Sequence, residues 1–323
     1  MRFNIHRQEC LCSLWIVEIT PMQFAVLGNA GSWYCDVLQG AATSRGHHCK
    51  RIDFTQLTSS VGVAAGAPQS GSPRAVPSES IKSSDVALNN LDAVIVRTMP
   101  PGSLEQVVFR MDALARLEAA GVTVMNSPKA IECAVDKYLA TSRLAAAGLP
   151  VPETVVCENA DAALAAFETL GGDVVVKPLF GAEGRGIVRV SDPDLALRTF
   201  RTLERIDAVL YLQRFVEHEG FDVRLLLLDG KLIGAMKRRS WDDFRTNVSR
   251  SGKAELHTAT EAERDLALRA AAAVGTRFAG VDLLYDRSGA CYVIEVNAVP
   301  GWRALQRVTG GNVASDVIAS LEE

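Results

Sequence analysis

A glycine-rich segment between two expected strands is the most informative stretch of this sequence. It reads Lys177-Pro178-Leu179-Phe180-Gly181-Ala182-Glu183-Gly184-Arg185-Gly186. Glycines allow backbone N–H groups to approach phosphate oxygens closely, and Lys177 adds a positive charge for the same anion. No Gly-Lys-Ser/Thr opens a helix here, so the segment is not a P-loop. It predicts a phosphate-binding loop, while a hairpin with a glycine-rich turn is the alternative that this segment alone leaves open.

Oxygen-bearing side chains are expected on one face of a β-hairpin near the end of the chain. Its strands are predicted at 279–285 and 290–297, joined by a turn at Asp286-Arg287-Ser288-Gly289. Four loop residues pair position 282 with position 293, and side chains alternate between the two faces. The residues that share one face are then Asp282, Val293, Glu295 and Asn297. Adjacent carboxylates need a cation, and oxygen ligands suit Mg²⁺ or Mn²⁺ beside nucleotide phosphates. The pattern predicts a metal site, with a solvated polar face as the alternative.

A third charged group lies between the glycine-rich segment and that hairpin. Asp222 and Arg224 alternate along an expected strand, which places both on one face and directs them into a cleft. Arginine forks match the geometry of carboxylates and phosphates. Further cations follow in Lys237-Arg238-Arg239 and in Phe244-Arg245-Thr246-Asn247. Of these, Lys237 and Arg238 are assigned to an exposed basic loop.

Alternating strands and helices carry these groups. A strand at 23–28, a helix around 37–41 and a strand at 50–54 open the chain as a β-α-β unit. Further strands are expected at 91–97, 122–125, 174–177, 186–190, 211–215 and 223–228, and further helices at 104–120, 136–147, 161–170 and 260–274, with another from Pro193. A capping signal at Ser127, followed by Pro128, predicts one more helix start, and a capping box at Thr260 supports the start of the helix at 260–274. The order of elements predicts an α/β fold.

Two stretches are expected to contribute nothing to a core. Ser59–Ser84 has eight serines, three prolines, three glycines and no aromatic residue, which predicts a flexible loop or insertion. Residues 1–21 precede Met22, a candidate for the true start, and are interpreted as an extension. Their apolar stretch, Leu11–Val17, is too short to span a membrane and is followed by no clean signal-peptide cleavage site.

The composition sets outer limits on function. The chain has 323 residues, of which 48% are hydrophobic and 22% charged, so it exceeds one ordinary core and is not a disordered chain. A net charge of −4 and a pI of about 5.8 exclude a broad nucleic-acid-binding surface. Seven thinly spread cysteines indicate reduced thiols. We therefore expect a cytoplasmic protein with neither nucleic-acid nor membrane partners.

Taken in order, the motifs resemble the ATP-grasp superfamily and, within it, the RimK-like amino-acid ligases. The resemblance covers residues 22–319. Its matching blocks are Asn126-Ser127-Pro128, Asp136-Lys137, Ala147 to Thr154, Val176-Lys177-Pro178 with its glycine loop, Asp222-Val223-Arg224, Phe244 to Asn247, and Gly280-Val281-Asp282 with Glu295-Val296-Asn297. The resemblance implies an N-terminal α/β pre-ATP-grasp domain at 22–130. A two-lobed ATP-grasp domain follows, with a small lobe and glycine-rich lid at 131–210 and a C-terminal lobe with the Mg²⁺ site at 211–323.

The resemblance also assigns roles to individual residues. Those implied to bind ATP are Lys137, Lys177, Gly181, Ala182, Glu183, Gly184, Gly186, Gln213, Arg214, Phe215, Val216 and Asp222. Among them, the loop closes over the phosphates, 213–216 form an adenine hinge through their backbone, and Asp222 approaches the ribose. Those implied to hold Mg²⁺ are Asp282, Glu295 and Asn297, and those implied to contact phosphate or the activated acyl group are Arg224, Arg245 and Asn247. Arg214 departs from the family, which usually carries Glu there, and this puts a side-chain contact in question.

Three further segments resemble the glutamate ligases linked to tetrahydromethanopterin and related one-carbon or deazaflavin cofactors. They are Phe180–Gly186, Arg97–Ser103 and Gly301–Gly310. The resemblance implies that a substrate carboxylate takes the γ-phosphate of ATP and that L-glutamate then displaces phosphate from the acyl phosphate. The expected acceptor is a pterin or deazaflavin cofactor. A ligase that modifies the C-terminus of a ribosomal protein and a non-catalytic ATP-binding module are the alternatives, and a homo-oligomer is compatible with each.

Overall fold

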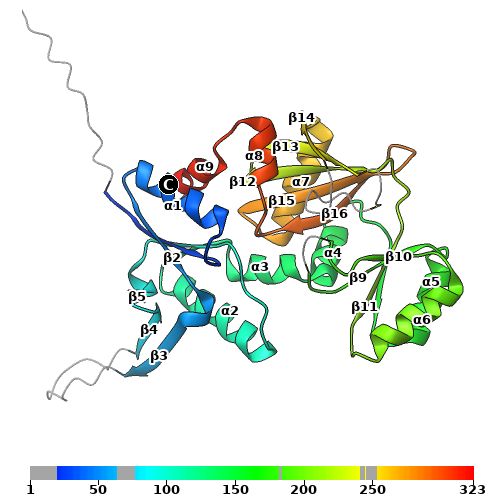
Figure 1. Ribbon diagram of the computed structural model, residues 1–323, viewed down its shortest axis with the longest axis horizontal. Helices are drawn as coiled ribbons and strands as arrows, with labels where there is room; N and C mark the ends of the chain where they lie inside the picture. The colour runs from blue at the N-terminus through cyan, green and yellow to red at the C-terminus, as the bar shows by residue number, and fades with distance from the viewer. Residues whose placement is uncertain (1–19, 64–76, 182–183, 241–243, 245–252) are drawn as a thin grey trace, which may run out of the picture.

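The computed structural model describes residues 20–63, 77–181, 184–240, 244 and 253–323 (Figure 1). Along the chain, a parallel N-terminal sheet is followed by a small antiparallel sheet and then by a larger antiparallel sheet. Helices pack against all three, so the mixed fold class predicted from the sequence is confirmed. Within the described residues, no helix is both long and apolar enough to cross a membrane.

The N-terminal sheet is built of parallel strands in the order β2-β1-β6-β7. Its strands are β1 (Gln23–Leu27), β2 (His48–Ile52), β6 (Ala93–Val96) and β7 (Thr123–Met125), and the helices beside it are α1 (Trp33–Ser44) and α2 (Leu104–Ala119). Every residue of β6 is buried, as expected for a parallel strand covered on both faces. The succession β1, α1 and β2 confirms the predicted β-α-β opening.

A further antiparallel sheet, separate from the three named above, projects from this unit, and its presence contradicts one prediction. Its strands are β3 (Leu57–Val63), β4 (Pro77–Ser83) and β5 (Val86–Ala87), flanked by short 3-10 helices at Phe54–Gln56 and Leu88–Asn90. The expectation of a flexible loop over Ser59–Ser84 is wrong at 59–63 and 77–83, because β3 and β4 pair with each other and satisfy their backbone groups. Ile81 is also fully buried in the N-terminal core. Residues 1–19 and 64–76, which include most of the expected extension, lie outside the described residues.

Helices α3 (Pro128–Val135) and α4 (Lys137–Ala146) lead from the parallel sheet toward the other two sheets (Figure 1). Each begins at a side-chain cap, Ser127 for α3 and Asp136 for α4. Just before them, the buried amide of Asn126 ties this junction to the larger sheet. It hydrogen-bonds the backbone of Arg277, Phe278 and Ala298. The junction that carries Lys137 is therefore fixed to the larger sheet.

The small antiparallel sheet has the strand order β10-β9-β11-β8. Its elements are β8 (Thr154–Cys157), α5 (Ala160–Thr169), β9 (Val174–Lys177), β10 (Val188–Val190), α6 (Pro193–Glu204) and β11 (Leu210–Arg214). The two helices and the sheet enclose a separate hydrophobic cluster that includes Phe167 and Phe200. The glycine loop joins β9 to β10 at the edge of this sheet.

The larger antiparallel sheet has the strand order β14-β13-β12-β15-β16. Its elements are β12 (Phe221–Leu228), β13 (Lys231–Arg239), β14 (Lys253–His257), α7 (Glu261–Val274), β15 (Phe278–Tyr285) and β16 (Cys291–Asn297). Thr260 and Glu263 form the predicted capping box of α7. Strands β8, β13 and β14 were not expected from the sequence, and β13 proves important for the site.

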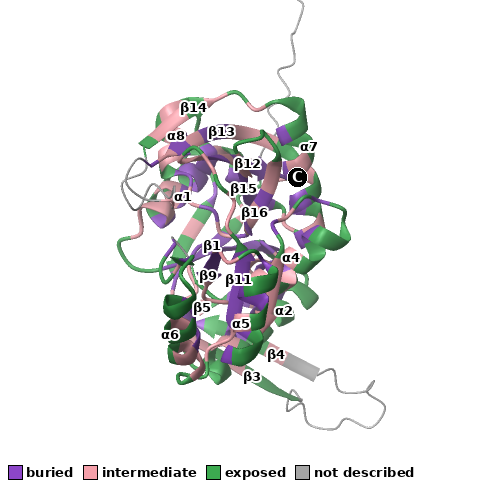
Figure 2. Ribbon diagram, turned by 90° about the vertical axis from the view of Figure 1, so that its right-hand side faces the viewer, coloured by how far each residue is buried: buried purple, intermediate pink, exposed green. Residues whose placement is uncertain are grey.

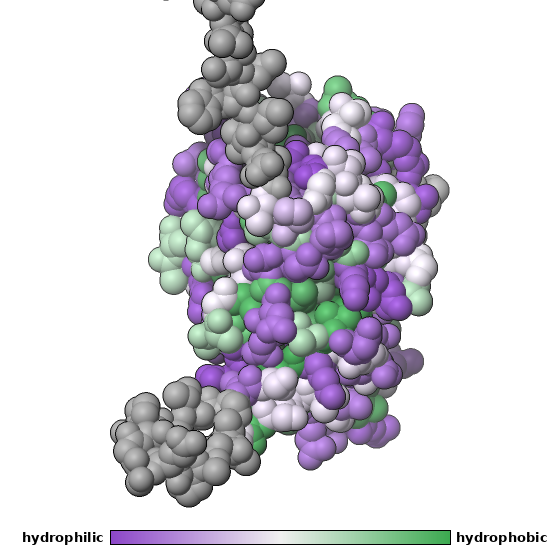
Figure 3. Space-filling model, turned by 90° about the vertical axis from the view of Figure 1, so that its left-hand side faces the viewer, coloured by the Kyte–Doolittle hydropathy of each residue, from purple (hydrophilic) through white to green (hydrophobic). Residues whose placement is uncertain are grey.

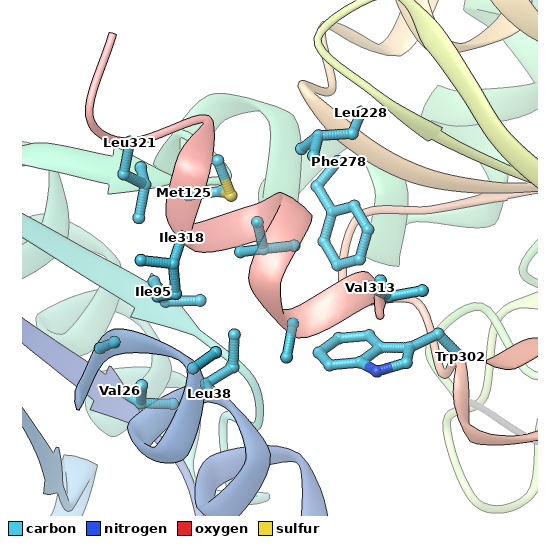
Figure 4. Packing of buried hydrophobic residues seen from close by; sticks show 14 of the residues in the cluster. Val26, Leu38, Ile95, Met125, Leu228, Phe278, Trp302, Val313, Ile318 and Leu321 are labelled. Atoms are coloured by element: carbon cyan, nitrogen blue, oxygen red, sulfur yellow. The ribbon is translucent and has the colours of Figure 1, made fainter. Parts of the chain in front are cut away.

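The last two helices return the chain to the N-terminal unit. They are α8 (Arg303–Thr309) and α9 (Val313–Ala319). Figure 4 shows α9 between residues of the parallel sheet, such as Val26 and Ile95, and residues of the larger sheet, such as Phe278. Trp302 is fully buried in the same cluster. The N-terminal and C-terminal parts of the chain therefore share one hydrophobic core.

Few polar side chains of the described residues are buried in the interior. Figure 2 shows buried strands through the middle of the molecule and exposed outer faces on α2, α5 and α6. On the N-terminal side, hydrophilic side chains cover most of the surface and hydrophobic ones gather near its centre (Figure 3). Several of the buried polar side chains line a single pocket, namely Gln213, Asp222, Arg238 and Asp282.

Candidate active site

The pocket lies between the small antiparallel sheet and the larger one. Its apolar lining includes Ala134, Leu144, Val175, Pro178, Ile187, Phe215, Leu284 and Ile294. Its polar and charged lining includes Lys137, Lys177, Gln213, Arg214, His218, Asp222, Arg238, Asp282 and Glu295. An apolar wall with a few converging charged groups is typical of a small-ligand site. The pocket thus brings together most residues that the sequence analysis assigned to ATP and two of those assigned to Mg²⁺.

The hairpin that carries the expected metal ligands has a different register from the predicted one. Leu283 lies opposite Val293, a β-bulge follows, and Asp282 then lies opposite Glu295. Asp282 and Glu295 therefore share one face as predicted, and Asn297, two residues further along β16, shares it as well. Val293 was wrongly placed on that face, because it is buried with Leu283 in the hydrophobic core. The bulge, rather than the loop length, brings the polar groups together.

Asp282 is the centre of a buried cluster of charges. Arg224 donates from Nε to Oδ1 and from Nη2 to Oδ2, each at 2.6 Å, and Nη2 of Arg238 lies 2.9 Å from Oδ2. Arg238 also donates to both oxygens of Asp222, at 2.6 and 2.5 Å. Burial raises the pKa of Asp282, but the two guanidinium groups outweigh burial and hold the pKa below its ordinary value. Asp282 is therefore ionised, and its charge is compensated within the cluster.

The position of Arg238 differs most clearly from the one predicted from the sequence. Lys237 and Arg238 were expected in an exposed basic loop, yet both belong to β13, and Arg238 is only 3% exposed. The physical reason is cross-strand pairing, since Asp222 on β12 lies directly opposite Arg238. A carboxylate on the neighbouring strand neutralises the buried cation. That partner is sixteen residues away, so no local pattern marks Arg238 as a site residue.

Lys177 ends β9 with its ammonium group in the pocket. Its Nζ donates to Oε1 of Gln213 at 2.6 Å, and the amide nitrogen of Gln213 donates to the hydroxyl groups of Thr154 and Tyr211. Burial lowers the pKa of Lys177 to about 8, against the attraction of Glu295. The side chain of Gln213 therefore holds the lysine in place, a role that the sequence did not indicate.

Lys137 reaches the same pocket from the start of α4. Its Nζ donates to the carbonyl of Gly181 at 3.0 Å, and burial lowers its pKa while Glu295 opposes that shift. In the glycine loop, Gly184 and Gly186 have φ angles of +67° and +75°, which disfavour any residue with a side chain. Two lysines and this loop form a cationic region of the pocket near Glu295.

Two backbone N–H groups of the expected adenine hinge already donate hydrogen bonds to other residues of the small lobe. The N–H of Arg214 donates to the carbonyl of Glu153 at 2.8 Å, and that of Phe215 donates to Asp173 at 3.0 Å. The Arg214 side chain also forms an ion pair with Glu153. Backbone recognition of adenine through this segment would therefore use its carbonyl groups and the N–H of Val216.

Some expected site residues lie outside this pocket or outside the described residues. Arg245, Asn247, Ala182 and Glu183 are not among the described residues, so their roles stay predictions. Arg224, Gly186 and Asn297 adjoin lining residues without lining the pocket themselves. Lining residues that sequence reasoning missed include Arg238, Thr141, Tyr211, Ile187 and Leu284. Most of these read as ordinary core or strand residues, so their types carried no signal.

The oxygen donors near Asp282 suit a small, hard cation. Asp282 and Glu295 offer carboxylates from neighbouring strands. The side-chain nitrogen of Asn297 lies 3.4 Å from the carbonyl of Gly280, so the side-chain oxygen of Asn297 is left as a metal ligand. Among the described residues, no group of three or more His, Cys, Asp or Glu side chains is placed to hold a metal. Asp282, Glu295 and Asn297 are therefore the described side chains that could hold Mg²⁺, and phosphate oxygens and water complete the coordination in sites of this kind.

The lowered pKa of Lys177 predicts that anion binding in the pocket weakens above pH 8. Its ammonium group loses its proton as the pH rises through about 8, instead of near 10.5. Affinity for Mg²⁺-ADP should then fall about fivefold between pH 8 and pH 9. Isothermal titration calorimetry over pH 7–9 measures this change, and the dependence should vanish in Lys177→Ala. A flat profile for the parent protein would contradict a phosphate contact from Lys177.

Unfolding does not account for such a loss. A lysine whose native pKa is lowered carries fewer protons in the folded than in the unfolded state between pH 8 and its ordinary value of 10.5. By linkage, the contribution of Lys177 to the free energy of unfolding then rises with pH across this window. A thermal melt at pH 9 is the matching control.

Comparison with known proteins agrees with this architecture. Residues 134–321 match the family model described as the RimK-like ATP-grasp domain, and residues 37–132 match the prokaryotic glutathione synthetase N-terminal domain. Among solved structures, the ATP-grasp ligase PsnB complexed with a minimal precursor superposes with a TM-score of 0.68 and 22% identity, covering 94% of this chain and 99% of that one. A RimK domain protein from Sphaerobacter thermophilus gives 0.64 and 23%, covering 93% and 100%.

Curated relatives extend the match to named enzymes. The tetrahydromethanopterin:alpha-L-glutamate ligase of Methanosarcina acetivorans is 38% identical over 76% of this chain and 84% of its own length. The ribosomal protein bS6–L-glutamate ligase of Escherichia fergusonii is 31% identical over 93% of this chain and 96% of its own length. Fold, pocket and relatives together define an ATP-dependent, amide-forming ligase. The chain belongs to the RimK-like ATP-grasp family, as the sequence motifs indicated.

Proposed function

We propose that this chain joins L-glutamate to a carboxylate of a small cofactor of the tetrahydromethanopterin type, with ATP and Mg²⁺. The observation that supports the reaction class is the pocket in which two lysines whose pKa values are lowered by burial, Lys137 and Lys177, lie near Glu295 and Asp282. The choice of acceptor is supported by sequence identity, which is 38% with the tetrahydromethanopterin ligase and 31% with the bS6 ligase.

Binding of ATP is divided among groups of different chemistry. Lys137, Lys177 and the amides of the glycine loop hold the phosphates, and the apolar wall of the pocket receives the adenine ring. Asp222, aligned by Arg238, lines the pocket and approaches the ribose. When bound by Asp282, Glu295 and Asn297, Mg²⁺ supplies neutralisation of phosphate charge.

The reaction proceeds in two steps. A carboxylate oxygen of the acceptor attacks the γ-phosphorus of ATP, and ADP leaves. The amine nitrogen of L-glutamate then attacks the acyl carbon, and phosphate leaves with the former carboxylate oxygen while the nitrogen loses a proton. Arg224, with Arg245 and Asn247, contacts the acyl phosphate. Such chemistry needs positioning and charge stabilisation rather than a general base on the protein, and closure of the glycine loop excludes water.

We also propose the domain boundaries expected from the sequence and add a role for helix α9. Residues 22–130 form the N-terminal pre-ATP-grasp domain, 131–210 the small lobe with its lid, and 211–323 the lobe with the Mg²⁺ site. Helix α9 packs on α1 and shares the N-terminal core, so it fixes the C-terminal lobe to the N-terminal domain. We propose that the reaction takes place in the cytoplasm.

Modification of a protein C-terminus is the second candidate, because the bS6 ligase covers more of this chain than the tetrahydromethanopterin ligase, 93% against 76%. A panel of acceptors separates the two. ADP release with Mg²⁺-ATP and L-glutamate is measured with a tetrahydropterin that carries a carboxylate, a deazaflavin that carries a carboxylate, or a peptide ending in the bS6 C-terminal sequence, and products are identified by mass spectrometry. We expect release and a glutamyl adduct with the tetrahydropterin. Adduct formation on the peptide alone would overturn the choice of acceptor, and no release with any amino acid would favour a non-catalytic module.

A further inference from the structure

The two arginines that contact Asp282 are held very differently. Arg238 is shared between Asp222 and Asp282, and its side chain is 4% exposed. Arg224 forms its ion pair with Asp282, and its side chain is 12% exposed. Among the described residues, the structure gives Arg224 no second carboxylate. Arg238 is therefore anchored from two sides, whereas Arg224 depends on Asp282.

The contact of Arg224 competes with metal coordination. Its fork takes both oxygens of Asp282, each at 2.6 Å, while Arg238 takes one of them at 2.9 Å. A divalent cation on the same buried carboxylate would meet oxygens that two guanidinium groups already occupy, and like charges that compete for one carboxylate repel strongly where water is excluded. One guanidinium group must therefore leave Asp282 when a metal binds. Arg238 keeps Asp222 as a partner, so Arg224 is the group that leaves.

Gly280, on the strand that carries Asp282, packs directly against the side chain of Arg224. A Cβ atom built on Gly280 would come within 3.7 Å of the Arg224 Nε and 3.0 Å of Pro300. A side chain at this position would crowd Pro300 and Arg224, so glycine lets the Arg224 side chain lie along this strand. A guanidinium displaced here lies next to the metal and carries an unpaired positive charge, which is the requirement for binding a second anion.

We propose that Arg224 exchanges one anion for another during the reaction. It pairs with Asp282 before the metal nucleotide binds and with the acceptor carboxylate or its acyl phosphate afterwards, while Arg238 stays on Asp222 and Asp282. The anion site of the acceptor is thus completed by metal nucleotide binding, which imposes an order on substrate binding. This proposal rests on the assignment of Asp282 to the metal in the proposed function.

Direct metal binding tests the first half of the exchange. Mn²⁺ is titrated into the nucleotide-free protein and free Mn²⁺ is followed by electron paramagnetic resonance. Arg224→Met should bind Mn²⁺ at least about tenfold more tightly than the parent, because a competing cation has gone. Arg224→Lys, which keeps the charge but not the two-pronged contact, should fall between them. The fold should persist because Asp282 keeps Arg238, and Arg277→Met is the matched control, since Arg277 makes a similar fork to Asp229 away from the pocket.

Phosphate binding tests the second half. Inorganic phosphate is the probe of the acyl-phosphate position, and its binding is measured by calorimetry. It should bind the Mg²⁺-ADP complex of the parent and of Arg277→Met, and bind at least tenfold more weakly to these proteins without nucleotide. Phosphate binding should be lost in Arg224→Met. Unchanged or weaker Mn²⁺ binding by Arg224→Met, or phosphate binding indifferent to the nucleotide, would overturn the exchange. Asp282→Asn separates this failure from that of the proposed site. If it leaves Mn²⁺ binding intact, the metal assignment itself is wrong.

Discussion

Glu295→Gln is expected to abolish Mg²⁺-dependent ADP formation while leaving the fold intact. Glu295 lies opposite Asp282 across the β15–β16 pair, and its charge acts on both Lys137 and Lys177. The amide keeps the size of the side chain and removes its negative charge. Because metal neutralisation of phosphate charge is worth several kcal/mol in the transition state, turnover should fall at least about a thousandfold.

A coupled assay of ADP release against Mg²⁺ concentration measures this loss. Glu255→Gln, the same substitution on β14 of the same sheet, should behave as the parent protein. Parent-like turnover and Mg²⁺ dependence in Glu295→Gln would remove this residue from the metal site. Asp282→Asn should also be inactive, but it leaves Arg224 and Arg238 without their shared carboxylate. Loss of one partner from a buried ion pair costs about 3 kcal/mol or more, so this variant also needs a stability measurement.

Lys177→Ala is expected to weaken ATP binding about thirtyfold or more. The half-buried Lys177 places its ammonium group beside Gln213 in the pocket, and a charge-assisted hydrogen bond to phosphate contributes about 2 to 3 kcal/mol. Truncation also leaves the amide oxygen of Gln213 without this donor. Calorimetry with Mg²⁺-ADP or a non-hydrolysable ATP analogue gives the change in affinity.

Lys231→Ala provides the matched control, since Lys231 begins β13 on the exposed surface. Its nucleotide affinity should equal that of the parent protein. If Lys177→Ala binds nucleotide as tightly as the parent, the glycine loop is only a turn, and the alternative left open by the sequence is the correct one.

Local signals in the sequence were sufficient for most elements that frame the site. Side-chain caps at Ser127 and Thr260 begin their helices as predicted, and the helix expected from position 136 begins at Lys137 with Asp136 as its cap. The glycine loop lies between two paired strands, and Lys177 ends the first of them. Each of these features depends on residues within a few positions of one another, which is why the sequence reveals them.

Contacts between distant strands could not be predicted in this way. Arg238 reads as one cation in a basic run, and only the pairing of β13 with β12 gives it Asp222 as a partner. Asp282 and Glu295 meet through a bulge that no loop length specifies. The hairpin of β3 and β4 formed from a serine-rich segment because burial of Ile81 and strand pairing outweigh its composition.

Transfer of labelled oxygen tests the central claim most directly. The acceptor carboxylate is labelled with ¹⁸O, and the inorganic phosphate released with ADP is examined by mass spectrometry in the presence of L-glutamate. An acyl-phosphate ligase moves a carboxylate oxygen to phosphorus, so the account predicts labelled phosphate in amounts equal to the amide formed. Unlabelled phosphate alongside amide product would contradict the mechanism, and ADP release without any amide would contradict the assignment as a ligase.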